Sequence, residues 1–169
     1  MTESTIAGWF AGRVPGDWFT GPPEVDVDRD EILVLGTLAE PAMGDDAGDE
    51  SRDAARLARI QGFREDTRDA RMRIADEAEQ RFGRKVAWAA RCGEHQAVFT
   101  NLSVPVMTRL RMPERRVLDT LVDAGVARSR SDALAWCVRL VGEHEDTWLS
   151  DLREALRHVE QVRAEGPRS

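Results

Sequence analysis

Apolar residues alternate with polar ones in two stretches of the chain, which predicts two β-hairpins. Residues 24–38 alternate on either side of the polar sequence DRDE, which is typical of a turn between two strands. Residues 85–104 alternate in the same way, with Gly93-Glu94 near the predicted turn. The residues predicted to be buried in this second hairpin are Trp88, Val98 and Phe99.

Between the hairpins, apolar residues recur every three or four positions and predict one long amphipathic helix from about Ser51 to Phe82. Gly83 suits a left-handed cap at its end. The arginines of this helix alternate with acidic residues, so we interpret most of them as a solvated, ion-paired face. The small acidic stretch 39–51 before the helix is predicted to be a mobile linker.

The C-terminal part has the pattern of a strand followed by helices. Residues 104–112 are extended in pattern, and Pro113 suits the first turn of a helix that closes at Gly125. Ser129 and Asp132 form a predicted capping pair at the start of the next helix. A heptad-like stripe then continues, as one helix or as two joined near Gly142: Leu134, Val138, Val141, Glu145, Trp148, Leu152, Ala155, Val159 and Val162.

The first 23 residues contain two similar sequences, GWFAG and DWFTG, in a Gly- and Pro-rich setting with no helical or strand period. A cluster of exposed aromatic side chains is unfavourable, so these residues either dock on the body of the protein or bind a partner. The candidate partner-binding residues are Trp9, Phe10, Trp18 and Phe19.

These patterns predict an α+β protein in which hairpins pack on a long amphipathic helix, followed by a strand-helix-helix unit and a C-terminal helix. We expect four segments. They are the aromatic segment 1–23, an α+β domain at 24–103, the strand-helix-helix unit at 104–142, and a C-terminal helix and tail at 143–169.

Charge is distributed unevenly. The chain of 169 residues has a net charge of −7, but residues 1–53 alone hold 3 basic and 13 acidic residues, a net of −10. Residues 104–142 hold 7 basic and 4 acidic residues, a net of +3, so a local positive field is expected there.

Several classes of function are disfavoured. The short apolar runs and the lack of a signal-peptide pattern predict a cytoplasmic protein with no membrane span. The two cysteines and three histidines offer one short pair, Cys92 and His95, which is too few ligands for a zinc site. No nucleophile motif or phosphate-binding glycine loop is present, so we expect neither an enzyme nor a bound cofactor.

Residues 106–141, and above all DAGVARSRSDALAWCV, resemble the ribbon-helix-helix family of DNA-binding proteins, the CopG/MetJ/Arc type. The rest of the chain resembles no family that we identify. In that family two chains pair their strands into a ribbon that enters the major groove, while the second helices hold phosphates at their N-termini. The resemblance implies base contacts by Met107, Arg109 and Arg111, and phosphate contacts by Arg128, Ser129, Arg130 and Ser131.

The resulting hypothesis is a sequence-specific DNA-binding protein that regulates transcription as a homodimer or as a higher oligomer on DNA. Two alternatives remain open. In one, the protein is an interaction adaptor whose C-terminal unit only dimerises. In the other, it is an antitoxin-like repressor whose N-terminal part wraps a protein partner.

Overall fold

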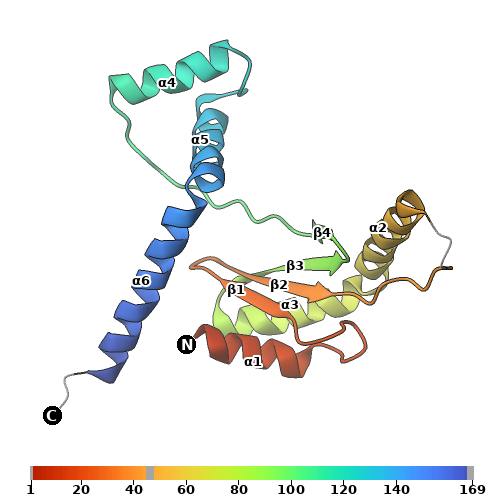
Figure 1. Cartoon of the computed structure of the whole chain (residues 1–169). Coiled ribbons are helices and arrows are strands. Elements are labelled where there is room, and N and C mark those ends of the chain that lie inside the picture. Colours follow the sequence, from red (N-terminus) through yellow and green to blue (C-terminus); the bar gives the residue numbers. More distant parts are fainter. Residues whose placement is uncertain (1, 45–47, 167–169) are drawn as a thin grey trace. The chain divides into compact units, whose positions relative to one another are not determined.

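The computed structural model describes residues 2–44 and 48–166, and the chain forms two compact units (Figure 1). Unit 1 spans Met1–Pro105 and unit 2 spans Val106–Ser169. Within the described residues, unit 1 combines a four-stranded sheet with three helices, and unit 2 consists of helices and connecting segments. The predicted α+β class is therefore confirmed. Residues 45–47 of the predicted linker 39–51 lie outside the described residues.

Both predicted hairpins are present and lie side by side in one sheet of order β1-β2-β3-β4. The strands are β1 (Glu24–Val27), β2 (Glu31–Thr37), β3 (Lys85–Cys92) and β4 (His95–Val98). Each hairpin is antiparallel, whereas β2 and β3 are parallel, with Val34 opposite Trp88. A parallel pair requires a long crossover connection, which the intervening helices provide.

The two hairpin turns follow from local residue chemistry. In the first, the Asp28 carboxylate accepts hydrogen bonds from the backbone N–H groups of Asp30 at 2.8 Å and Glu31 at 2.7 Å. In the second, Gly93 has a φ of 57°, which glycine adopts without steric cost, and Cys92 pairs with His95 across the turn.

Two helices replace the single long helix that was predicted for residues 51–82. They are α2 (Asp49–Asp66) and α3 (Arg68–Phe82), and the break falls at Thr67. The Thr67 hydroxyl donates a hydrogen bond to the Phe63 carbonyl at 2.5 Å, and such a bond within the helical ladder favours a bend. Gly83 ends α3 with a φ of 69°, as expected.

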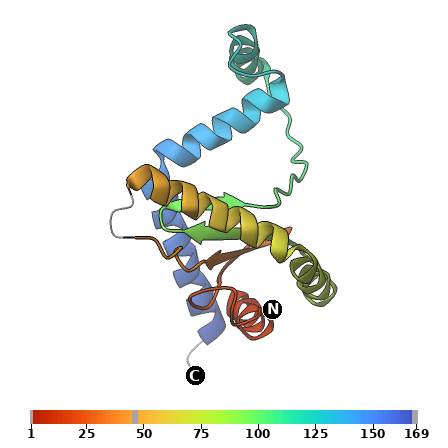
Figure 2. The same cartoon turned by 90° about the vertical axis from the view of Figure 1, so that its right-hand side faces the viewer.

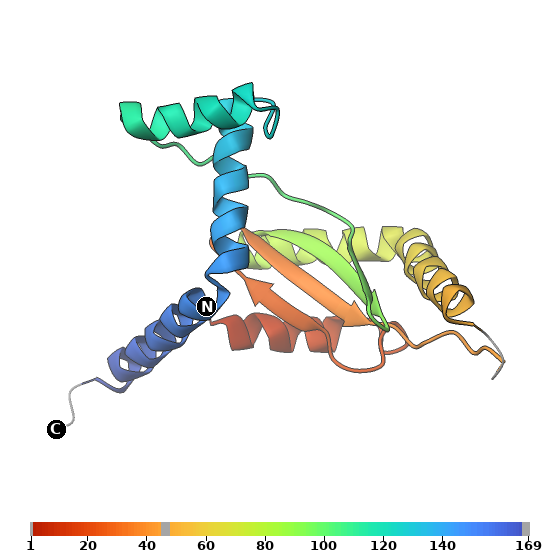
Figure 3. The ribbon, with the colours of Figure 1, turned by 45° about the horizontal axis from the view of Figure 1, so that its top comes forward.

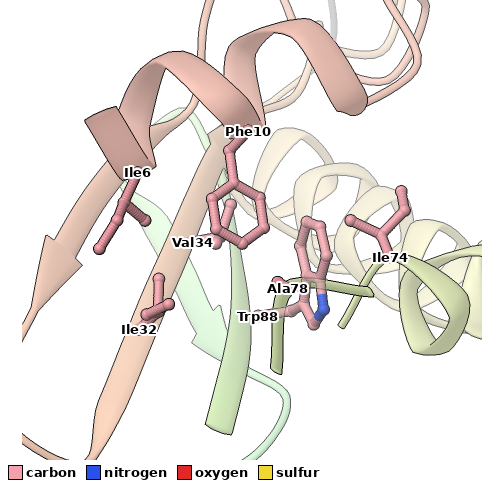
Figure 4. Close-up of a cluster of buried hydrophobic side chains, with 7 residues drawn as sticks. All are labelled: Ile6, Phe10, Ile32, Val34, Ile74, Ala78 and Trp88. Carbon is pink, nitrogen blue, oxygen red and sulfur yellow. The ribbon is translucent and has the colours of Figure 1, made fainter. Parts of the chain in front are cut away.

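The N-terminal segment is also different from the prediction, because residues Glu3–Arg13 form a helix, α1. Helices α1 and α3 pack on one face of the sheet (Figure 3) and together form the main core of unit 1 (Figure 4). The Arg13 guanidinium joins them by two 2.6 Å hydrogen bonds to the Glu77 carboxylate. The buried residues of this core are Ile6, Phe10, Ile32, Val34, Ile74, Ala78 and Trp88.

Helix α2 crosses strands β3 and β4 on the same face (Figure 2). A second cluster lies beneath it, with Leu38, Ile60, Ala90 and Cys92 buried and Phe63 and Phe99 packed around them. Trp88 is buried as predicted, but Val98, which was predicted to be core, is exposed. Val98 lies at the end of the edge strand β4, opposite Ala89 on the face that the helices do not cover.

Unit 2 contains α4 (Met112–Asp123), α5 (Arg130–His144) and α6 (Asp146–Glu165). Its buried residues, within the part of the unit that the structure describes, are Leu118, Ala127 and Ala133. The C-terminal stripe lies on two helices, separated at Glu145. Residues 104–111, where a strand was predicted, form no strand in the single described chain, and Met112 already begins α4. Across the described ranges, no helix is long and apolar enough to cross a membrane.

Candidate functional site

The N-terminus of α5 carries the capping pair that was predicted from Ser129 and Asp132. The Ser129 hydroxyl accepts a hydrogen bond from the Asp132 backbone N–H at 3.2 Å. The Asp132 carboxylate in turn accepts one from the Arg128 backbone N–H at 2.9 Å. This arrangement satisfies two N–H groups at the start of the helix and fixes the turn that leads from α4 into α5.

Arg130 joins α5 to α4. Its guanidinium donates two hydrogen bonds, at 2.6 and 2.8 Å, to the carboxylate of Asp119. The Arg130 side chain lowers the pKa of Asp119, and the carboxylate raises that of Arg130. This predicted phosphate contact is therefore already paired with a carboxylate inside its own unit, although Arg130 is exposed, as Arg128 and Ser131 are.

The segment that was predicted to contact DNA bases, residues 106–111, is largely exposed to solvent and lies beside the start of α5. Met107 is 95% exposed, and Arg109 and Arg111 are also exposed. A shallow groove runs between this segment and the two helices, with Arg130 and Ser131 on its wall. The other lining residues are Val106, Thr108, Leu110, Arg115, Leu118 and Leu134, together with Met107.

Three arginines in the same stretch of chain as the groove-lining residues have no acidic partner within ion-pair distance among the described residues: Arg109, Arg111 and Arg116. Arg115 is tied to its own segment by a 2.8 Å hydrogen bond to the Leu110 carbonyl. Arg128 is 97% exposed and lies 3.9 Å from Asp132. Unit 2 thus presents unneutralised positive charge next to a helix N-terminus, which is a suitable arrangement for an anion.

The aromatic residues of the N-terminal segment pack on unit 1, as the self-docking interpretation expects. Phe10 is fully buried, with its ring centroid 6.0 Å from that of Trp88. Trp9 contacts Phe82 with a centroid distance of 5.4 Å. Trp18 and Phe19 both pack against Phe63, at 5.5 and 5.3 Å.

Cys92 and His95 are paired across the turn of the second hairpin. Cys92 is buried, and burial, with a further contribution from Glu40, raises the pKa of its thiol. A raised pKa disfavours the thiolate that nucleophilic chemistry requires. The His95 ring nitrogen Nε2 lies 3.0 Å from an Asp53 carboxylate oxygen. Across residues 2–44 and 48–166, no group of three or more His, Cys, Asp or Glu side chains is placed to hold a metal ion.

The sequence analysis did not single out Arg71, which is 6% exposed and therefore buried, whereas most arginines of this region were expected to be solvated. The spacing of Arg71 in the sequence indicates burial, because it lies four residues after Thr67 and three before Ile74, on the apolar side of the helix. The surrounding groove is lined by two further arginines, Arg64 and Arg68, and by Phe99.

Comparison with known proteins gives matches over almost the whole chain. Residues 4–98 match the family model described as Rv1265-like protein, N-terminal domain, and residues 111–163 match the Mb1296 C-terminal domain. The uncharacterized proteins Rv1265 of Mycobacterium tuberculosis and Mb1296 of Mycobacterium bovis are each 56% identical to the chain over 164 residues. These matches cover 97% of the chain and 71% of each relative. No solved structure matches the chain.

These matches correct the resemblance that was drawn from residues 106–141. The family model over this region is the Mb1296 C-terminal domain, so the identification as a ribbon-helix-helix protein was wrong. Unrelated families share a capped turn between two amphipathic helices, because the turn depends only on local residues. The turn at residues 123–132 therefore resembled that of the ribbon-helix-helix family without a family relationship. The chain belongs to the Rv1265-like family.

Proposed function

We propose that the protein is a homodimer that binds duplex DNA through unit 2 and regulates transcription. The observation that carries this proposal is the group of exposed arginines without acidic partners: Arg109, Arg111 and Arg116. Arginines gathered in one short stretch of chain, here residues 109–116, attract the phosphate backbone, and arginine also suits the acceptor pattern of guanine in the major groove. Met107 adds an exposed apolar side chain that is able to contact a thymine methyl group.

The small core of unit 2 supports the proposal of a second copy. Its buried residues lie between α4 and α5, and the described part of α6 has no buried residue. An apolar stripe remains exposed along α5 and α6, made of Val138, Val141, Trp148, Leu152, Val159 and Val162. A unit of this size with so little buried surface is marginal alone, and pairing with a second copy would bury the stripe.

The test begins with the oligomeric mass of the full chain and with selection of binding sites from random duplexes. The triple variant Arg109→Ala/Arg111→Ala/Arg116→Ala should then bind the selected duplex more weakly, by about 1–3 kcal/mol for each of these arginines that reads a base. Its affinity for DNA should also depend less on salt. The slope of the logarithm of the binding constant against the logarithm of the salt concentration should become less steep by about one for each arginine that neutralises a phosphate. Arg157→Ala on α6 is the matched control, because it removes an exposed arginine outside this group.

A monomeric mass would contradict the dimer, and unchanged affinity of the triple variant would contradict the DNA-binding surface. The exposed stripe on α6 also favours an adaptor that dimerises through unit 2 and binds no DNA. That function would give a dimer whose selected duplexes share no sequence and whose affinity for DNA is the same in the triple variant and in the control.

A further inference from the structure

Unit 1 contains a buried positive charge, that of Arg71, which no carboxylate among the described residues neutralises. The guanidinium of Arg71 donates from Nε to the Thr67 hydroxyl at 2.9 Å and from Nη2 to the Arg64 carbonyl at 2.6 Å. Neither acceptor carries a charge, and among the described residues no acid lies within ion-pair distance of Arg71. Burying a cation in this way costs free energy unless an anion is near, so the position is unusual for a purely structural residue.

The Arg71 guanidinium is held in a fixed orientation. It lies over the ring of Phe99, with 4.8 Å between its Cζ atom and the ring centroid, and the Arg64 guanidinium lies 5.9 Å from the same ring. Such contacts stabilise a cation and restrict its rotation. Its two hydrogen bonds restrain it further, while Nη1 has no hydrogen-bond acceptor among the described residues. The Arg71 guanidinium is therefore held in place, and its Nη1 group is still able to donate hydrogen bonds to a ligand.

Two more arginines bring like charge to the same groove. Arg64 and Arg68 line it together with Arg71, and the acidic residue in the lining is Glu65, which accepts a hydrogen bond from Gln61. The lining thus has three positive charges against one negative. Burial lowers the pKa of Arg71, and the charges of Arg64 and Arg68 lower it further. Arg68 also lies 3.8 Å from Asp69, but both side chains are largely exposed, so this pair neutralises little.

We propose that this groove, formed where α2 meets α3 and lined by Phe99, binds the phosphate group of a small phosphorylated ligand through Arg64, Arg68 and Arg71. A phosphate offers several oxygens to guanidinium donors and up to two negative charges, which relieve the repulsion among the three arginines. The groove lies in unit 1 and the proposed DNA-binding arginines lie in unit 2, so this ligand site is independent of the DNA-binding proposal.

The experiment titrates inorganic pyrophosphate, and separately inorganic phosphate, into the full chain. Binding is followed by calorimetry and by the NMR signals of the arginine Nε–H groups. The signal of Arg71 should shift on addition of either anion. The double variant Arg64→Gln/Arg68→Gln should bind pyrophosphate about tenfold more weakly or worse, because it removes charge-assisted hydrogen bonds. Both side chains are on the solvent side of their helices, so the variant should keep the unfolding midpoint of the wild type.

Arg73→Gln is the matched control, since it removes an exposed arginine of α3 that does not line the groove. Arg71→Lys keeps the charge but removes the planar fork, and should also weaken binding. Equal affinity of the double variant and the Arg73→Gln control would overturn the proposal. A double variant that binds duplex DNA more weakly while its pyrophosphate affinity is unchanged would also overturn it, because the groove would then serve nucleic acid.

Discussion

Replacing Phe10 with alanine tests whether the aromatic N-terminal segment is part of the core of unit 1. The Phe10 side chain is fully buried, in edge-to-face contact with Trp9 at 4.9 Å and Trp88 at 6.0 Å between ring centroids. Truncating a buried phenylalanine removes its transfer free energy and leaves a cavity, which together cost about 3–5 kcal/mol. With a urea m-value of about 2 kcal/mol/M, the unfolding midpoint of unit 1 should fall by about 2 M.

The assay is urea unfolding followed by tryptophan fluorescence, with Trp136 and Trp148 replaced by phenylalanine so that the signal comes from unit 1. Ser4→Ala on the exposed side of α1 is the control and should change stability by less than about 0.5 kcal/mol. An unchanged midpoint in Phe10→Ala would refute the packing argument. If the same variant abolished binding of a protein partner without a change in stability, the segment would be a partner-binding motif.

Two smaller perturbations probe the sheet of unit 1. Gly36→Ala would place a Cβ atom against the Phe19 ring and should destabilise unit 1 by about 1–3 kcal/mol, measured by thermal unfolding; an unchanged midpoint would contradict this packing. The backbone N–H groups of Asp30 and Glu31 lower the pKa of Asp28. This stabilisation is complete above the ordinary aspartate range and disappears as the pH falls through the lowered value. Urea unfolding at several acidic pH values should therefore show that the free energy of unfolding falls less steeply with decreasing pH in Asp28→Asn than in the wild type. Identical pH profiles would argue against stabilisation of the fold by the Asp28 carboxylate.

Local patterns in the sequence predicted the features that depend on neighbouring residues. The two hairpins follow from alternation and from the chemistry of their turns, at Asp28 and at Gly93. The capping pair of Ser129 and Asp132 follows from side chains that satisfy N–H groups of their own helix start. Each of these turns and caps is specified within about five residues, so no knowledge of the rest of the chain was required.

Features that depend on distant residues were missed. Helix α1 buries Ile6 and Phe10 against the sheet, but two buried positions in eleven residues give too weak a period to predict a helix, and Gly8 and Gly12 weaken it further. The break at Thr67 depends on a hydroxyl that bonds the Phe63 carbonyl instead of solvent. The parallel pairing of β2 with β3 sets two hairpins in one sheet, which neither alternating pattern specifies alone.

The candidate sites divide in the same way. The sequence by itself determined where positive charge collects in residues 104–142 and how α5 begins, because composition and capping are local properties. Only the tertiary structure decided which arginines are already paired. Arg130 is bound to Asp119 on another helix, and Arg71 is buried against Phe99 on the chain that follows β4. The sequence shows an arginine in the same way whether its charge is solvated, ion-paired or buried. Which of these three environments it has depends on the distant residues that folding brings next to it.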